Sequence, residues 1–478
     1  MRTVSPTKPN IVLIFADDWG YGDLSCLNPQ SRIPTPHTDA LARQGTVFTD
    51  AHSCSAVCTP SRYGLLTGRY AWRSRLKEGV LLGFSRELIE PGRLTMAALL
   101  QRAGYHTACI GKWHLGLGWS LRSGEPVPLA YNAPADPGVA YDRPLFAGPH
   151  TVGFDYSFIL PASLDMAPYV YIENGVVMEA PDRVCESSPR PAFWRGGPIA
   201  PGFQHETCLL ECTRRAEAFL AHAAQREPER PFFLYLPLPS PHTPHVPRAP
   251  FRSRSRCGAY GDYVVEHDWA IGRVVAALDR HGLREQTMVV VTSDNGAHMR
   301  GLDFDFEREY GHRSNGRFRG QKSDAWEGGH RVPFIVSWPG HTPPGSCCDC
   351  LISQTDCLAT VAELLELPLP EGVGEDSVSF RPLLDGIFNH TPRRHLVHSS
   401  ITNRQALRVG RWKLIDGPGS GGWSAPDHLM PAEAPPRQLY DLEADPEESR
   451  NLHDRERARV EELEVLLEAI RQGRPAPV

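Results

Sequence analysis

Four short, largely apolar runs constrain the fold of this chain most strongly. They occupy residues 10–16, 105–110, 231–238 and 287–293. Apolar runs of this length without polar alternation are typical of strands buried on both faces, as in parallel sheets covered by helices. Helical patterns lie between them, at residues 94–103, 206–224 and 260–281. Because strands alternate with helices, we predict an α/β fold built on a large, mostly parallel sheet flanked by helices.

The pattern changes near Leu384. Before it, residues 117–204 are rich in proline and glycine, as is typical of loop excursions that shape substrate pockets. After it come short strand candidates and one charged amphipathic helix, at residues 395–399, 406–415, 437–442 and 455–471. We therefore expect a large domain over residues 1–384. A smaller C-terminal subdomain of antiparallel strands plus a helix is expected over residues 385–478.

Composition and charge argue against several classes of protein. The formal net charge of −6 argues against a nucleic-acid binder, whose binding surface is basic. No apolar run approaches the ~20 residues that a membrane-spanning helix needs. Met1–Pro9 is polar, and the apolar run Ile11–Phe15 is too short for the core of a signal peptide. We therefore predict a cytoplasmic protein with no nucleic-acid or membrane partner, or a periplasmic or secreted one if a leader was trimmed.

Two pairs of oxygen-bearing side chains directly follow two of the predicted strands. Asp17 and Asp18 follow the first strand, and Asp294 and Asn295 follow the strand at 287–293. Because ligands bind beyond the carboxyl ends of the strands in open α/β sheets, both pairs point at one crevice. Either pair alone would more readily be a turn former or a helix cap. Together they favour a hard cation, which we predict to be Ca²⁺, with Mg²⁺ as the alternative.

A cysteine motif adds a chemical function. Cys58-Thr-Pro-Ser-Arg62 is followed by Leu-Leu-Thr-Gly-Arg69. A bare Cys-x-Pro-x-Arg match arises by chance, but the trailing Leu-Thr-Gly-Arg makes the match much more specific. This segment resembles the signature of the formylglycine-dependent sulfatases, in the branch that contains arylsulfatase A and N-acetylgalactosamine-6-sulfatase. Cys54, four residues before the motif, is predicted to be structural.

Further motifs of the same family follow in order. Gly111–Gly116 matches its Gly-Lys-Trp-His-Leu-Gly segment and supplies Lys112 and His114. These two side chains share a face of an extended chain because they are two residues apart. Without the family pattern, a solvated lysine beside a core histidine would be the better interpretation. His242-Thr-Pro matches the family's His-x-Pro element, although His245-Val-Pro fits the same spacing.

The resemblance spans roughly residues 9–415. Lys322 opens a segment similar to the family's Lys-x4-Glu-Gly-Gly element, and Ser163 resembles, more weakly, a serine of its substrate pocket. Near Ser163, Asp165 and two tyrosines offer a carboxylate and aromatic faces that suit a sugar. A solvated acid beside core aromatics explains the same residues equally well.

The resemblance implies an alkaline-phosphatase-like fold and a particular nucleophile. In such enzymes a formylglycine-generating maturase oxidises the cysteine that corresponds to Cys58, and the resulting aldehyde hydrates to a geminal diol. One hydroxyl attacks sulfur, and the other later expels sulfate and regenerates the aldehyde. The modified Cys58 is also expected among the metal ligands, beside Asp17, Asp18, Asp294 and Asn295.

The resemblance also implies roles for the remaining residues. Arg62 would hold the diol, while Lys112 and Lys322 would neutralise the transferring group. His114 is expected to act as the base that breaks down the sulfated intermediate. His242 is expected to act as the acid for the departing alcohol. The substrate-binding residues are predicted to be Ser163, Asp165 and His245.

The predicted substrate is a sulfated small molecule or glycan, most readily a carbohydrate sulfate ester. Two other functions fit the same pattern. One is a phosphoester or phosphonate hydrolase on the same fold, since such enzymes share the metal site. The other is a non-catalytic protein that binds sulfated glycans, which would have lost the nucleophile or the metal ligands. Every expected position is filled here, and this argues against the non-catalytic alternative.

Overall fold

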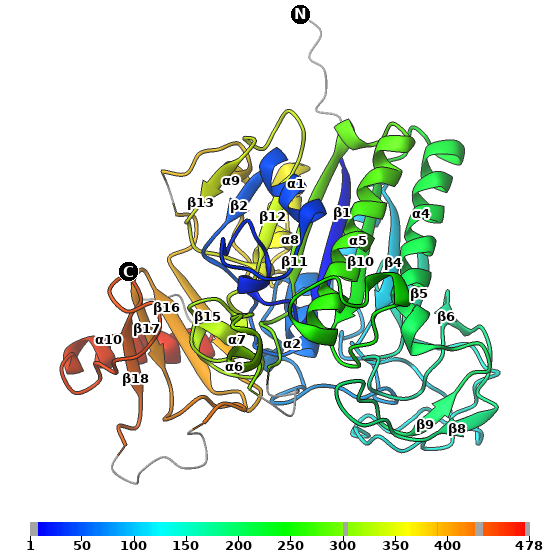
Figure 1. The fold of residues 1–478 in the computed structure, drawn as a ribbon, viewed down its shortest axis with the longest axis horizontal. Helices are drawn as coiled ribbons and strands as arrows, with labels where there is room; N and C mark the ends of the chain where they lie inside the picture. Colours follow the sequence, from blue (N-terminus) through cyan, green and yellow to red (C-terminus); the bar gives the residue numbers. More distant parts are fainter. Residues whose placement is uncertain (1–7, 300–304, 390, 426–433, 474–478) are drawn as a thin grey trace, which may run out of the picture.

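The computed structural model describes residues 8–299, 305–389, 391–425 and 434–473. Its central sheet contains β1 (Asn10–Asp17), β2 (Thr46–Phe48), β4 (His106–Lys112), β5 (Tyr156–Leu160), β6 (Ile172–Glu173), β7 (Val176–Val177), β10 (Phe232–Pro241), β11 (Thr287–Ser293), β12 (Phe334–Ser337) and β13 (Ser346–Cys348). Their order across the sheet is β13-β2-β12-β11-β1-β10-β4-β5-β6-β7 (Figure 1). Strands β11, β1, β10, β4 and β5 run parallel, and β12 is antiparallel to β11. The predicted mostly parallel sheet is confirmed.

Helices cover both faces of this sheet. One face carries α1 (Pro36–Gln44), α4 (Cys208–Arg226) and α5 (Gly258–Arg280), and the other carries α2 (Cys58–Thr67), α3 (Met96–Arg102) and α8 (Cys357–Leu364) (Figure 1). Three shorter helices are α6 (Phe306–Tyr310), α7 (Glu327–His330) and α9 (Arg381–Leu384). Every residue of β1 is buried, as expected for a strand between two helical layers.

The parallel strands place chemistry-bearing residues at one edge of the sheet. Asp17 closes β1, Lys112 closes β4, His242 follows β10 and Asp294 follows β11. The pairing of Ala16 with Ser293 brings the ends of β1 and β11 level. Residues from four distant segments therefore meet beyond the carboxyl ends of the strands, where open α/β sheets bind their ligands.

The proline- and glycine-rich excursion at residues 117–204 forms loops and short strands, as predicted. Apart from β5, β6 and β7, which extend the central sheet, its strands are β8 (Arg183–Cys185) and β9 (Gly197–Ile199), which pair with each other. It lies at the lower right of Figure 1, near the carboxyl ends of the parallel strands. A second small pair joins β3 (Ala51–His52) to β14 (Ile352–Ser353).

A four-stranded antiparallel sheet follows, which we call the C-terminal sheet. It contains β15 (His395–Ser399), β16 (Gln405–Val409), β17 (Trp412–Ile415) and β18 (Gln438–Asp441), and α10 (Arg457–Arg471) packs beside it. The prediction of one strand over residues 406–415 was wrong. The chain turns at Gly410, whose φ of 53° lies in the left-handed region that glycine adopts readily. The segment is therefore a hairpin.

The C-terminal sheet docks onto the rest of the chain through buried polar contacts. Ser399 of β15 forms a bridge with Ser55. Lys413 of β17 lies with its Nζ 3.0 Å from a carboxylate oxygen of Glu327 and 2.8 Å from one of Glu448. None of these three charged side chains is exposed. The docking is therefore specific rather than a loose apolar contact.

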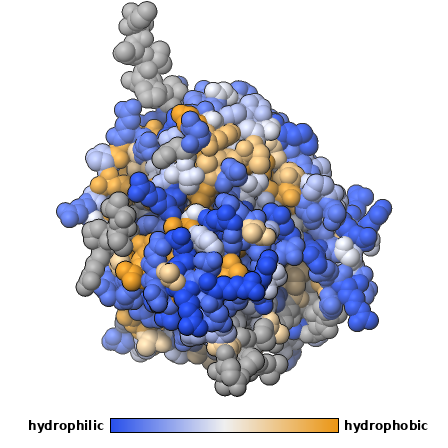
Figure 2. Space-filling model, turned by 90° about the vertical axis from the view of Figure 1, so that its left-hand side faces the viewer, coloured by the Kyte–Doolittle hydropathy of each residue, from blue (hydrophilic) through white to orange (hydrophobic). Residues whose placement is uncertain are grey.

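None of the helices in the described part of the chain is both long enough and apolar enough to cross a membrane. The side of the molecule that carries the C-terminal sheet is mostly hydrophilic, with scattered apolar spots (Figure 2).

Candidate active site

The acidic side chains that follow β1 and β11 form one buried cluster. The backbone N–H of Asp18 donates to Asp294 Oδ1 at 3.1 Å, and Asn295 Nδ2 donates to Asp18 Oδ1 at 2.7 Å. Asp18 has a φ of 64°, an uncommon left-handed conformation for a non-glycine residue. Burial, together with repulsion from Asp17, raises the pKa of Asp294 to about 6. The crowded carboxylates therefore favour a cation between them.

Two lysines contact these carboxylates. Lys112 Nζ lies 2.6 Å from Asp17 Oδ2, and Lys322 Nζ lies 2.7 Å from Asp18 Oδ1. Burial opposes ionisation of Asp18, but Lys322 and His242 outweigh it and lower the pKa of that carboxyl. The two lysines reach the cluster from β4 and from the loop before α7, so the site holds two buried positive charges beside its acids.

Cys58 is the first residue of α2 and is only 2% exposed. Its Sγ and carboxylate oxygens of Asp17 and Asp294 all lie within 4.8 Å of one another. Burial raises the pKa of the thiol even though Lys112 and Lys322 act in the opposite direction. The thiolate is the reactive form of cysteine, so the unmodified Cys58 is a poor nucleophile at neutral pH.

Arg62 lies one helical turn after Cys58 and is fully buried. Its Nη2 lies 2.7 Å from Asp294 Oδ2. The guanidinium therefore fixes one wall of the acidic cluster, on the face of α2 that presents Cys58. Cys54 is also buried, with its Sγ 3.6 Å from the carbonyl oxygen of Pro60, and this position agrees with the structural role predicted for it.

His242 belongs to a chain of polar contacts beside the acidic cluster. Its Nδ1 lies 3.1 Å from Ser163 Oγ, which is 3.3 Å from Lys112 Nζ. Its Nε2 lies 3.6 Å from Asp18 Oδ2. Burial and the charge of Lys322 lower the pKa of His242 to about 4. The ring is therefore neutral at neutral pH in the absence of a bound anion.

His114 is buried with one ring nitrogen available. Its Nε2 lies 2.7 Å from the carbonyl oxygen of Leu81 and donates to it, so Nδ1 carries the lone pair. That Nδ1 has no hydrogen-bond partner. Burial and the charge of Lys112 hold the pKa of His114 well below its usual value. His114 is therefore a neutral base that is itself not exposed to solvent.

The two other predicted substrate-binding residues, Asp165 and His245, are both buried. Asp165 forms an ion pair with Arg195, while its Oδ1 has no hydrogen-bond partner. His245 packs edge-on against Tyr260 with ring centroids 5.4 Å apart, and burial lowers its pKa to about 3. Asp165 thus keeps an acceptor for a ligand, and His245 is a packed neutral ring.

Three residues of the site were missed by the sequence analysis: His298, Trp423 and Arg195. The rings of His298 and Trp423 lie 4.7 Å apart. Burial and Lys322 lower the pKa of His298 to about 3. Its place three residues after Asn295 is a signal that sequence inspection could have used. Trp423 had none, because only the docking of the C-terminal region brings its backbone N–H to Ser323 Oγ at 2.9 Å.

The residues of the cluster fit a divalent metal ion. Among the described residues, Asn295 Oδ1 and Asp17 Oδ1 are buried without a hydrogen-bond donor. Buried polar atoms are rarely left unpaired, so both oxygens are available as ligands. Carboxylate and amide oxygens are the donors that hard cations such as Ca²⁺ and Mg²⁺ prefer.

Comparison with known proteins agrees with this geometry. The family model described as Sulfatase matches residues 9–367. The chain belongs to the sulfatase family. It is 36% identical to an N-acetylgalactosamine-6-O-sulfatase of Bacteroides thetaiotaomicron, covering 97% of this chain and 93% of that protein. It is 33% identical to human arylsulfatase A, covering 93% and 83% of the two chains.

A solved sulfatase structure supports the fold assignment. It comes from work on the metabolism of multiple glycosaminoglycans by Bacteroides thetaiotaomicron. It superposes with a TM-score of 0.83 at 33% identity, covering 98% of this chain and all of that one. This chain is therefore a sulfuric ester hydrolase with the alkaline-phosphatase-like fold. The matched span of the family model contains every predicted site residue from Asp17 to Lys322.

Proposed function

We propose that this sulfatase hydrolyses sulfate esters of carbohydrates through a formylglycine made from Cys58, with Ca²⁺ as the metal. One observation carries the proposal: Cys58 lies at the start of a helix, within 4.8 Å of two carboxylates of the acidic cluster. A helix N-terminus favours an anionic oxygen. The raised pKa of the thiol supports conversion of this residue, because the unmodified side chain would react poorly.

The proposed ligands of the metal are Asp17, Asp18, Asp294, Asn295 and the modified side chain of residue 58. Oxygen donors of this kind suit Ca²⁺, with Mg²⁺ as the alternative. When bound, the metal would polarise a sulfate oxygen and acidify a hydroxyl of the modified residue. The proposed formylglycine would supply, as its hydrate, the hydroxyl that attacks sulfur.

The cations are proposed to hold the transferring group. Lys112 and Lys322 enter the cluster on different sides and can donate to the equatorial oxygens of a sulfate placed between them. The guanidinium of Arg62 is fixed by Asp294 at 2.7 Å. On this basis Arg62 orients the modified residue 58 through the shared face of α2.

Two histidines are proposed to move protons. His242 lies near Asp18 and Lys322, so a bound anion would raise its lowered pKa and let it protonate the leaving alcohol. His114 keeps a free Nδ1 lone pair and is the proposed base for releasing sulfate. Their environments differ, since only His242 contacts a carboxylate of the cluster through its ring.

The proposed substrate is N-acetylgalactosamine 6-sulfate or a closely related sugar sulfate. Support comes from the relative named for that activity, which matches nearly the whole chain. Asp165 offers an unpaired carboxylate oxygen for a sugar hydroxyl. Ser163 and His245 are proposed to line the same pocket. We also propose that the catalytic domain comprises residues 1–384 and that residues 385–478 form the C-terminal subdomain.

The experiment that tests this proposal combines mass spectrometry with sulfate release. Protein produced with a formylglycine-generating maturase, which is the proposed partner, should give a Cys58 peptide lighter than the thiol form. That protein should release sulfate from N-acetylgalactosamine 6-sulfate, and Cys58→Ala should not. Full activity with an unmodified cysteine would disprove the nucleophile. A higher kcat/KM for an aryl phosphate than for the matching aryl sulfate would favour the phosphoester alternative instead.

The cytoplasmic location stays a prediction.

A further inference from the structure

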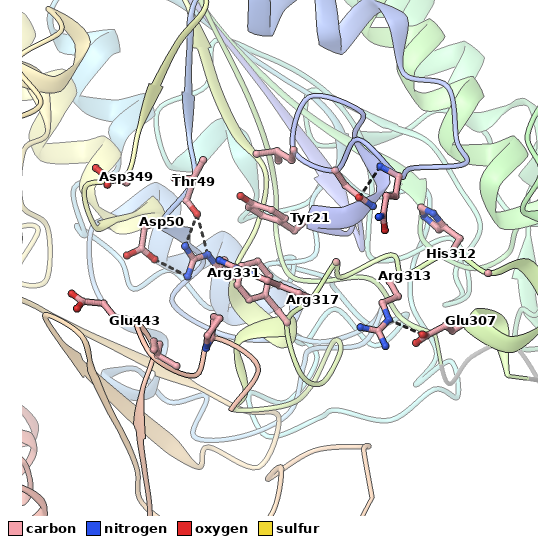
Figure 3. Close-up of a pocket in the computed structure, with 18 of the residues that line it drawn as sticks. Tyr21, Thr49, Asp50, Glu307, His312, Arg313, Arg317, Arg331, Asp349 and Glu443 are labelled. Atoms are coloured by element: carbon pink, nitrogen blue, oxygen red, sulfur yellow. Dashed lines mark hydrogen bonds and ion pairs between the residues drawn. The ribbon is translucent and has the colours of Figure 1, made fainter. Parts of the chain in front are cut away.

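A second polar cleft of about 1180 Å³ lies between the C-terminal sheet and the rest of the chain (Figure 3). Its walls come from the segment after β1, the turn between β2 and β3, the segment after α6, and the C-terminal sheet. The residues used below are Tyr21, Asp50, Arg317, Phe318, Arg331 and Arg408. None of the residues that line this cleft belongs to the proposed catalytic set.

Two arginines of the cleft have unused hydrogen-bond donors. Arg408 is only 7% exposed, and its Nη2 lies 3.3 Å from Asp50 Oδ2 while its Nη1 has no hydrogen-bond partner. Leaving a buried charged donor unpaired is costly, so a ligand oxygen at this position is favoured. Arg317 is exposed, and within the described residues no carboxylate pairs with its guanidinium.

An aromatic wall lies beside these cations. The ring of Phe318 has the Arg331 guanidinium 4.5 Å from its centroid and the Arg317 guanidinium 5.8 Å from it. Tyr21 meets the same ring edge-on at 5.1 Å. Figure 3 shows Tyr21, Arg331 and Arg317 together at the centre of the view. Aromatic surface next to arginines suits a sugar that carries an anionic substituent.

Most of the carboxylates in the cleft are already paired with arginines. The pairs are Asp50 with Arg331, Glu307 with Arg313, and Glu443 with Arg411. Asp305 caps α6. Asp349 lies on the left of Figure 3, away from Arg317. Asp349 is thus drawn apart from Arg317, which lies at the centre of the view.

A smaller hollow adjoins the cleft. This hollow of about 540 Å³ shares Arg313, Arg317 and Phe318 with the cleft and extends to Met299 and Gln321. Met299 follows His298, and Gln321 precedes Lys322. The smaller hollow therefore reaches residues that adjoin His298 and Lys322 in the sequence.

We propose that this cleft binds the anionic sugars of a sulfated glycan chain whose target sulfate occupies the active site. The inference rests on the proposed carbohydrate function and extends it from a single sugar to an oligosaccharide. Arg317 and the Nη1 of Arg408 would donate to sulfate or carboxylate groups of the chain, with the half-buried Tyr21 against a sugar ring. The specific requirement is an anionic chain long enough to reach from one site to the other.

The test measures binding as a function of glycan length. Cys58→Ala protein, which cannot turn over substrate, is titrated calorimetrically with N-acetylgalactosamine 6-sulfate and with a 6-O-sulfated galactosaminoglycan hexasaccharide. The hexasaccharide should bind at least tenfold more tightly than the monosaccharide. Arg317→Glu in the same background should remove that gain and leave the monosaccharide Kd within twofold. Arg280→Glu, an exposed charge reversal at the end of α5, should keep the gain.

Two results would overturn the inference. One is equal affinity for both ligands in Cys58→Ala protein, and the other is a length-dependent gain that survives Arg317→Glu. Failure of the proposed function is distinguishable, because it would appear as no sulfate release from any sugar sulfate by the matured enzyme. The binding comparison would then still decide whether the cleft holds an anionic glycan.

Discussion

Arg62 and Asp294 form a fully buried ion pair, with Nη2 and Oδ2 2.7 Å apart. The pair joins α2, which presents Cys58, to the end of β11, which presents the proposed metal ligands. The pair therefore helps to hold the nucleophile and the metal site in register, together with the hydrogen bond from Arg62 Nη1 to the carbonyl oxygen of Lys112. Because both groups are buried, separating them would leave a charge without a partner in the interior of the protein.

The first prediction concerns that pair. Arg62→Met should lower the free energy of unfolding of the metal-free protein by about 3–5 kcal/mol, because it leaves a buried carboxylate without its counter-charge. Urea unfolding in the presence of a chelator measures this. The control Arg280→Met, at an exposed site, should change it by less than about 0.5 kcal/mol. A loss below about 1 kcal/mol for Arg62→Met would contradict the argument.

Metal removal should abolish sulfate release and destabilise the protein. A ligand present at a hundredfold excess over its Kd stabilises the folded state by about 2.7 kcal/mol. Adding Ca²⁺ to chelator-treated enzyme should therefore raise its melting temperature and restore activity, with Mg²⁺ as the comparison. In Asp294→Asn protein the thermal response to Ca²⁺ should shrink. If neither Ca²⁺ nor Mg²⁺ raises the melting temperature, the result contradicts the proposed metal site.

His242→Gln should affect substrates according to their leaving group. With a sugar sulfate, kcat/KM should fall by about 10²–10⁴-fold, because the departing alkoxide needs a proton. With 4-nitrophenyl sulfate the loss should stay below about tenfold, since that phenolate leaves unaided. His222→Gln, at an exposed position of α4, serves as the control. Equal losses on the two substrates would remove the acid role from His242.

A buried histidine cluster predicts how stability depends on pH. His52, His330 and His398 pack together, with His52 Nδ1 3.0 Å from His330 Nδ1 and the rings of His330 and His398 3.4 Å apart. Burial lowers the pKa of all three below the usual value. Around them lie Asp50, Glu327, Lys413, Arg331 and Arg408.

A histidine whose pKa is lower in the folded than in the unfolded state binds its proton more weakly when the protein is folded. The folded protein is therefore fully stable at pH values above the unfolded pKa of about 6.5, and its stability falls as the pH drops toward the folded pKa. These three groups contribute at most about 4 kcal/mol per pH unit to the slope between pH 6.5 and 5, in addition to the contribution of the active-site histidines. Urea unfolding at pH 7, 6 and 5 measures it. His398→Phe should reduce the slope by about 1.4 kcal/mol per pH unit, which corresponds to one proton. His453→Gln should leave the slope unchanged. A slope of zero would refute the prediction.

The parts of the fold that the sequence predicts are those determined by local pattern. Residues 10–16 and 287–293 have too few polar positions for anything but buried strands, so the meeting of Asp17 with Asp294 follows from topology alone. Residues 406–415 alternate apolar with charged residues, as a strand exposed on one face does, but the turn at Gly410 depends on a backbone conformation that this pattern does not reveal.

The missed site residues have a different cause. His298 and Trp423 are separated by more than a hundred positions, and they meet only because the C-terminal region docks beside Ser323. The salt bridge of Arg195 with Asp165 joins two parts of a loop excursion in which the sequence shows no hydrophobic periodicity. Such contacts depend on tertiary packing, and no local propensity encodes them.

The ion pairs of Lys413 make the two parts of this enzyme inseparable. Glu327 lies in the segment that follows Lys322, yet its charge is balanced by a residue some ninety positions later. A chain cut before the C-terminal sheet would retain the proposed nucleophile, cations and metal ligands, but Glu327 would lose Lys413 and, among the described residues, keep only Arg331 as a charged partner, at 3.0 Å. Shortening or exchanging this C-terminal region would therefore disturb the segment that carries Lys322, and with it catalysis. Any engineered chimera of this enzyme must keep Lys413, Glu327 and Glu448 together.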